Sequence, residues 1–127
     1  MQDNLLFEYA VIRVMPRVER EEFLNVGVIV YCAKAGFLKS RFHLDKEKLR
    51  SFFNEVNIQE IHDNLCSIER ICIGSQESGP IGKLDIASRF RWLTATRSTV
   101  VQSSKVHPGF CSDASQKLDK LFQQLVL

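Results

Sequence analysis

Three segments with the composition of β-strands follow one another within the first 43 residues of the chain. Residues 5–15 read LLFEYAVIRVM, residues 26–32 read VGVIVYC and residues 37–43 read FLKSRFH. β-Branched and aromatic residues dominate, and the first and third segments alternate apolar with polar positions. Pro16 ends the first segment, and the short link Ala33–Gly36 favours antiparallel pairing of the second with the third. The sequence therefore predicts a three-strand meander.

Beyond residue 43 the spacing of apolar residues changes to three and four, which indicates helices. Each of four predicted helices begins after a residue suited to N-capping: Asp45, Asn57, Asp85 and Asp113. The second helix ends at Gly74, and the segment Ser98–Gln102 has the composition of a fourth strand. Strands followed by helices predict an α+β fold: a single domain over residues 1–127, with an antiparallel sheet of about four strands and helices packed on it.

The overall charge excludes few classes of function. The chain has 17 Lys and Arg residues against 15 Asp and Glu residues, and the net charge of +2 is too small to indicate nucleic-acid binding by bulk charge. Its apolar runs are shorter than the roughly 20 residues of a membrane span. The N-terminal segment lacks the pattern of a signal peptide. We therefore expect a cytoplasmic protein.

The cysteines and histidines do not form a pattern of metal ligands. The four cysteines are Cys32, Cys66, Cys72 and Cys111, and none is in a Cys-x-x-Cys pair. Their apolar surroundings are typical of reduced, buried thiols rather than of a disulfide framework. His62 stands four residues before Cys66, but no second pair has ligand spacing. Motifs of hydrolases, metalloproteases, deaminases and dinucleotide-binding proteins are absent, so we expect neither metal nor cofactor.

Positive charge is concentrated in the segment RFRWLTATRST at residues 89–99. Guanidinium groups bind two oxygens of a phosphate or carboxylate at once, and hydroxyl groups can complete such a site. The candidate residues of an anion- or partner-binding surface are Arg89, Arg91, Trp92, Arg97, Ser98, Thr99 and the nearby Lys83. The alternative is a structural role, in which Trp92 is half-buried and the arginines pair with acidic helices.

The connection between the first two strands, residues 17–25, carries five charges. Further candidate contributors to the anion site are Arg17, Arg20 and Glu22 in this connection, together with His107. His107 stands before a predicted turn at residues 108–109. In an enzyme Glu19, Glu21 or Glu22 would act as a general base or metal ligand, whereas a solvated hairpin with internal ion pairs requires no such role.

Two long stretches of the sequence resemble a known family. They are YAVIRVMPRVEREEFLNVGVIVYC at residues 9–32 and GPIGKLDIASRFRWLTATRSTVVQSSKVHPG at residues 79–109, with RFRWLTA and RSTV as the most specific strings. The chain is identified as a member of the bacterial domain-of-unknown-function family 3037. The resemblance implies a small single-domain bacterial protein and, as a partner, a kinase of the HipA-like type. It implies no catalytic residue, and Thr96 and Lys105 stand where family members often have proline.

These observations favour a non-enzymatic binding or accessory module whose arginine-rich surface binds phosphate or an acidic partner. Arginine binds anions well but seldom supplies a proton or a nucleophile. The alternative is a small enzyme acting on nucleic acid or a nucleotide, with a carboxylate of residues 17–25 opposite the arginine cluster. The enzyme requires that these two segments meet in one cleft.

Overall fold

The computed structural model describes residues 5–53, 55–97 and 99–127, with the backbone alone at residue 18. In these residues an antiparallel sheet is built from β1 (Leu5–Val14), β2 (Leu24–Cys32), β3 (Phe37–Phe42), β4 (Val101–Ser103) and β5 (His107–Cys111). The strand order is β3-β2-β1-β4, and β5 also pairs with β1. The α+β class and the predicted meander of β1, β2 and β3 are therefore confirmed.

The long strand β1 holds two short strands along one of its edges. β4 pairs with its C-terminal half through Ile12–Val14, and β5 pairs with its N-terminal half through Leu5–Tyr9. Between the two, the backbone N–H of Ser104 donates to the carbonyl of Val11 at 2.8 Å, and the N–H of Val11 donates to the Ser104 hydroxyl at 2.8 Å. A side chain thus completes the edge where the two short strands meet.

Four α-helices accompany the sheet in the described residues. They are α1 (Lys46–Phe52), α2 (Ile58–Ile73), α3 (Ile86–Leu93) and α4 (Ala114–Leu125). All four predicted N-caps are confirmed, because each side chain accepts a hydrogen bond from the backbone N–H three residues later: Asp45, Asn57, Asp85 and Asp113. Within the described part of the chain, no helix combines the length and apolar character needed to cross a membrane.

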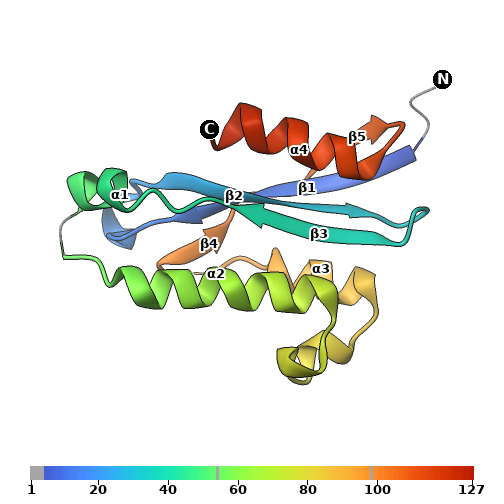
Figure 1. Cartoon of the computed structure of the whole chain (residues 1–127), viewed down its shortest axis with the longest axis horizontal. Coiled ribbons are helices and arrows are strands. Elements are labelled where there is room, and N and C mark those ends of the chain that lie inside the picture. The colour runs from blue at the N-terminus through green and yellow to red at the C-terminus, as the bar shows by residue number, and fades with distance from the viewer. Residues whose placement is uncertain (1–4, 54, 98) are drawn as a thin grey trace.

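The helices cover both faces of the sheet, with α2 and α3 on one side and α4 on the other (Figure 1). Alternation along β2 supplies both cores: Ile29 and Tyr31 face α2, whereas Val28 and Val30 face α4. Because both faces are covered, the buried stretch of β2 is apolar at nearly every position. The edge strand β4 lies beside α2, and a cavity opens between them.

Gly27 allows a close approach between the backbones of β2 and β3 near the start of β2. Register along β1 and β2 shifts here, since Ile12 pairs with Gly27 but Arg13 pairs with Asn25. A Cβ atom at position 27 would stand 2.8 Å from the carbonyl oxygen of Arg41. The crowded β3 backbone therefore requires glycine at this position, next to the bulge.

Two predictions about the C-terminal half were wrong. His107 and Pro108 lie in β5, not at a turn, because an edge strand accepts a proline whose missing N–H faces away from the ladder. In the described residues the sheet has five strands, and about four were predicted. The fourth strand begins at Val101, since Thr99 and Val100 form a bend, and Ser98 lies outside the described residues.

Candidate functional site

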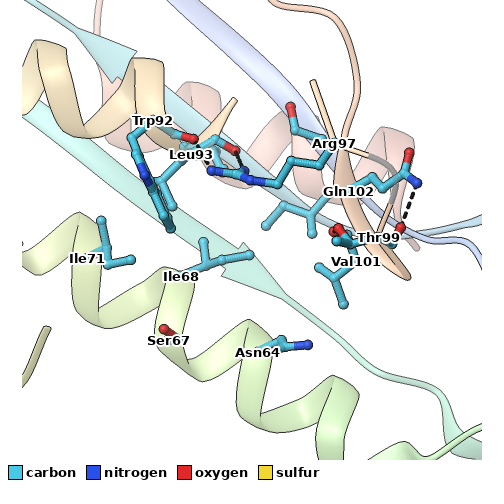
Figure 2. A pocket seen from close by; sticks show the side chains of 13 residues that line it. Asn64, Ser67, Ile68, Ile71, Trp92, Leu93, Arg97, Thr99, Val101 and Gln102 are labelled. Atoms are coloured by element: carbon cyan, nitrogen blue, oxygen red, sulfur yellow. Dashed lines mark hydrogen bonds between the residues drawn. The ribbon is translucent and has the colours of Figure 1, made fainter. Parts of the chain in front are cut away.

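A cavity of about 220 Å³ opens between α2, the end of α3 and the edge strand β4 (Figure 2). Its floor consists of apolar side chains from both the sheet and the helices: Ile12, Ile29, Ile68, Ile71, Leu93 and Val101. Its rim carries polar or amphipathic groups: Asn64, Ser67, Trp92, Arg97, Thr99, Gln102 and Ser103. An apolar floor with a few polar groups around it is the usual character of a binding pocket.

Trp92 and Arg97 form one wall of this cavity as a coupled pair. Trp92 is 42% exposed, and the guanidinium carbon of Arg97 lies 4.4 Å from the centroid of its ring. Arg97 Nη1 donates to the carbonyl of Leu93 at 3.2 Å, and Nη2 donates to the carbonyl of Trp92. These bonds satisfy carbonyls at the C-terminal end of α3, where a positive charge is favourable. Figure 2 shows both side chains across the opening from Ile68 and Ile71 of α2.

Thr99 closes the end of the cavity beside β4. Its hydroxyl donates to the carbonyl of Val101 at 2.8 Å, and its own carbonyl accepts a bond from Gln102 Nε2 at 2.6 Å. These bonds hold the bend in front of β4 and set Gln102 on the rim (Figure 2). Ser98, predicted for the same surface, falls outside the described residues.

The remaining residues of the predicted basic cluster do not line this cavity. Arg89 is buried, and its Nη1 donates to the carbonyls of Ile71 and Cys72 at 2.9 Å each. Arg91 is exposed and forms an ion pair with Glu8 of β1, with Nη2 3.0 Å from Oε2. Lys83 is exposed at the end of the 3-10 turn Ile81–Lys83. The basic cluster predicted from the sequence is therefore divided in the structure. Its members Trp92, Arg97 and Thr99 line the cavity.

The charged connection between β1 and β2 lines a second, predominantly polar hollow of about 340 Å³. The lining residues are Pro16, Arg17, Arg20, Glu22, Arg50, Ser51, Phe52 and Phe53. Arg20 Nε lies 2.8 Å from Glu22 Oε1, so the internal ion pair expected for a solvated hairpin is present. His107 lies in β5, where its ring centroid is 5.2 Å from that of Tyr9.

A third hollow of about 170 Å³ lies between these two places along α2. It shares Asn64 with the cavity beside Trp92, and it shares Pro16 and Phe53 with the hollow at residues 17–25. Arg17, Arg20 and Glu22 thus lie at one end of a series of three hollows, and the arginine segment contributes to the other end. Within the described part of the chain, the two segments line no common hollow of this series.

Sequence reasoning missed the residues that α2 and α1 contribute. Asn64 and Ser67 lie on α2 next to the apolar stripe that contains Ile68, and this position beside the core-facing stripe was the signal available. Arg50 gave no such signal, because it is one of several charged residues in a short helix. The structure shows that Arg50 and Arg17 line the same hollow, which lies between α1 and the connection after β1.

Chemical groups suited to metal binding are sparse. On α2, Cys66 Sγ lies 3.7 Å from His62 Nδ1. In the described parts of the chain, no three side chains of His, Cys, Asp or Glu gather closely enough to hold a metal ion. What the cavity beside Trp92 offers is therefore an apolar floor with hydrogen-bonding and cationic groups at its rim.

Comparison with known proteins assigns a family. The sequence model of the family described as "Protein of unknown function (DUF3037)" matches residues 9–126. No curated protein and no solved structure matches the chain. Because the match runs through nearly the whole sequence, the chain belongs to this family.

Proposed function

We propose that this member of the DUF3037 family is a non-enzymatic binding module that receives one apolar side chain of a partner protein in the cavity beside Trp92. An acidic group of the partner then meets Arg97 at the rim. The observation that carries the proposal is the apolar cavity itself, with the stacked pair of Trp92 and Arg97 as its wall.

The size of the cavity favours a single side chain over a cofactor or nucleotide. Its volume is about 220 Å³. An engineered protein cavity of about 150 Å³ accepts benzene, whereas pockets for whole drug-sized ligands measure roughly 300–1,000 Å³. One phenyl ring or branched aliphatic side chain therefore fits the space, and a nucleotide does not.

The composition of the wall favours a protein partner. Tryptophan and arginine are the residues most enriched among those that dominate binding energy at protein interfaces. Arg97 uses two N–H groups on the carbonyls of Trp92 and Leu93, and a guanidinium has five. The remaining donors, on a group already held in place by the indole, support binding of a carboxylate. A kinase of the HipA-like type, implied by the family resemblance, is the partner to test first.

The alternative, an enzyme acting on nucleic acid or a nucleotide, has weaker support. It requires a carboxylate of the connection after β1 in the same cleft as the arginine segment. Glu22 lines the other end of the series of hollows and is paired with Arg20. Glu19 and Glu21 are exposed and line none of the three hollows. A nucleotide bound at Arg97 would therefore have none of these carboxylates beside it to act as a general base.

Trp92 provides the test, because it is the single tryptophan of the chain. Its fluorescence is followed during titration with the capped dipeptides acetyl-Phe-Glu-amide, acetyl-Phe-Gln-amide and acetyl-Ala-Glu-amide. We expect a saturable change with Phe-Glu, weaker binding of Phe-Gln because it lacks the carboxylate, and no saturation with Ala-Glu because it lacks the ring.

Two arginine variants make the test specific. Arg97→Gln should abolish the preference for Phe-Glu over Phe-Gln. The matched variant Arg91→Gln changes an exposed arginine of α3 that lies outside the cavity, and it should retain that preference. The proposal fails if Ala-Glu binds as well as Phe-Glu, or if both variants behave alike.

A further inference from the structure

The hollow at the start of the series, beside α1, carries a second site that is independent of the proposed function. We infer that Arg17, Arg20 and Arg50 form a binding site for a dianionic phosphate group, that of a phosphate monoester or of free phosphate. This hollow differs in chemistry from the cavity beside Trp92, because its lining is predominantly polar and cationic.

Two separately anchored elements bring the three arginines together. Arg17 and Arg20 lie at the 3-10 turn Val18–Arg20, where the N–H of Arg20 donates to the carbonyl of Arg17 at 3.1 Å. Arg50 comes from the last turn of α1, which is fixed in the core by the fully buried Leu49. The connection is fixed by Met15, whose N–H bonds to the carbonyl of Val100. The site is therefore set by the fold rather than by one flexible segment.

Neighbouring side chains orient two of the guanidinium groups. The guanidinium carbon of Arg17 lies 4.7 Å from the ring centroid of Phe53, so an aromatic face supports the plane of the group. Arg20 is held through Nε by Glu22 at 2.8 Å. That bond uses one of five N–H donors and leaves both terminal nitrogens for a ligand. Among the described residues, no carboxylate forms a salt bridge with Arg17 or Arg50.

The charge of the lining matches a dianion. Three arginines and Glu22 give +3 − 1 = +2, and a phosphate monoester carries about −1.5 to −2 at neutral pH. Its three terminal oxygens can each accept from a separate guanidinium group, whereas a carboxylate has two oxygens and one charge. A free metal cation is repelled by the same charges. The volume of about 340 Å³ holds the phosphate together with the first atoms of the group that carries it.

An experiment distinguishes two sources of the phosphate group, a phosphorylated side chain and free phosphate. Inorganic phosphate, O-phosphoserine and dimethyl phosphate are titrated at about pH 7.5, above the second pKa of about 6 of a phosphorylated side chain. The buffer contains about 150 mM salt, where the screening length is about 8 Å. Binding is followed by ¹H–¹⁵N NMR of the arginine Nε groups and of the Trp92 indole. Tighter binding of phosphoserine assigns a phosphorylated side chain, and equal binding assigns free phosphate.

We expect saturable shifts at Arg17, Arg20 and Arg50 with inorganic phosphate and with O-phosphoserine, none with monoanionic dimethyl phosphate, and an unmoved Trp92 indole signal. Arg17→Gln and Arg50→Gln should each weaken binding about tenfold, since a hydrogen bond to a charged group is lost. Arg70→Gln is the matched control, because Arg70 occupies the last turn of α2 as Arg50 occupies that of α1. This control should bind as the parent protein does.

Three outcomes would overturn the inference. Shifts that spread evenly over all arginines, or that occur equally with dimethyl phosphate, would indicate general ionic attraction. Undiminished binding in a folded Arg50→Gln protein would remove α1 from the site. The outcome is separate from that of the dipeptide titration, which reports on Trp92 at the other end of the series of hollows.

Discussion

Arg89 reaches from α3 to the end of α2, where its Nη1 donates a hydrogen bond of 2.9 Å to the backbone carbonyl of Cys72. The same nitrogen also donates to the carbonyl of Ile71, and Arg89 is only 8% exposed. The last carbonyls of a helix lack partners within the helix, and a cation there is favourable. Gly74 makes the approach possible, because a Cβ atom at that position would stand 2.6 Å from Nη1. Arg89 thus joins two helices inside the fold.

We predict that Arg89→Met destabilises the protein by about 1.5–3 kcal/mol, because it leaves buried helix carbonyls without their charged donor. Arg91→Met removes an exposed ion pair with Glu8 and should cost only about 0–1 kcal/mol. Urea denaturation of the two variants measures the difference. Equal midpoints for the two proteins would contradict the structural role of Arg89.

The helix on the other face of the sheet yields a prediction about packing. Leu121 and Phe122 of α4 are buried, and Phe122 also lies beneath the guanidinium of Arg41 at 4.5 Å. Replacing either with alanine should cost about 2–5 kcal/mol, since each leaves a cavity against β2 and β3. The exposed neighbour Gln123→Ala serves as control. A denaturation midpoint unchanged by Phe122→Ala would exclude this packing.

Thiol labelling should separate one cysteine from the other three. Cys32, Cys72 and Cys111 are buried, as the sequence predicts, whereas Cys66 is partly exposed on α2, contrary to the same prediction. Burial raises the pKa of the Cys111 thiol as well as blocking reagent. A thiol reagent at neutral pH should therefore modify one group per native molecule and four after denaturation. Rapid labelling retained in Cys66→Ala would show that a second thiol is accessible.

The edge of the sheet supplies a prediction that no sequence pattern indicates. Ser104 accepts from the N–H of Val11 at 2.8 Å and donates to the carbonyl of Lys105 at 2.9 Å. Ser104→Ala leaves the Val11 amide buried without an acceptor, which should cost about 1–3 kcal/mol. Hydrogen exchange at Val11 should accelerate as well. The exposed Ser112→Ala should change neither quantity, and protection of Val11 that survives in Ser104→Ala would refute the assignment.

Local chemistry explains how far the fold could be predicted from sequence. Asn57 and Gly74 bound α2 as predicted, because an N-cap and a left-handed C-cap act through their immediate neighbours. The strand β5 was missed because its Pro108 and Gly109 ordinarily mark turns. Tertiary context overrides that preference: a Cβ atom at position 109 would stand 2.8 Å from the ring of Phe7.

The candidate site was predictable only in part, since charge density along a chain does not indicate where each side chain points. Arg89 and Arg97 are eight residues apart, yet one is buried against α2 and the other lies on the rim of the cavity. Arg50 approaches Arg17 only because α1 packs beside the connection after β1. Such pairings depend on contacts distant in sequence, which neither spacing nor composition encodes.

Cys72 makes the stability of the protein sensitive to alkaline pH. Its thiol is buried, and this burial raises its pKa from 9.0 to about 11, although the positive charge of Arg89 acts in the opposite direction. Since the folded protein holds the proton more tightly than the unfolded chain, the contribution to stability is complete below about pH 9. It is lost progressively as the pH rises from about 9 to 11, by about 2–3 kcal/mol in total.

The free energy of unfolding should therefore decrease more steeply between about pH 8.5 and 10.5 in the parent protein than in Cys72→Ala, which has no thiol at this position. The alanine variant starts from a lower stability, because it removes a buried sulfur, so the slope with pH is the quantity to compare. Cys66→Ala removes the partly exposed thiol of the same helix and should keep the parent slope. Parallel pH profiles for the parent and Cys72→Ala would mean that burial does not keep the Cys72 thiol protonated. Water would then have to reach this thiol at the end of α2, where Arg89 packs.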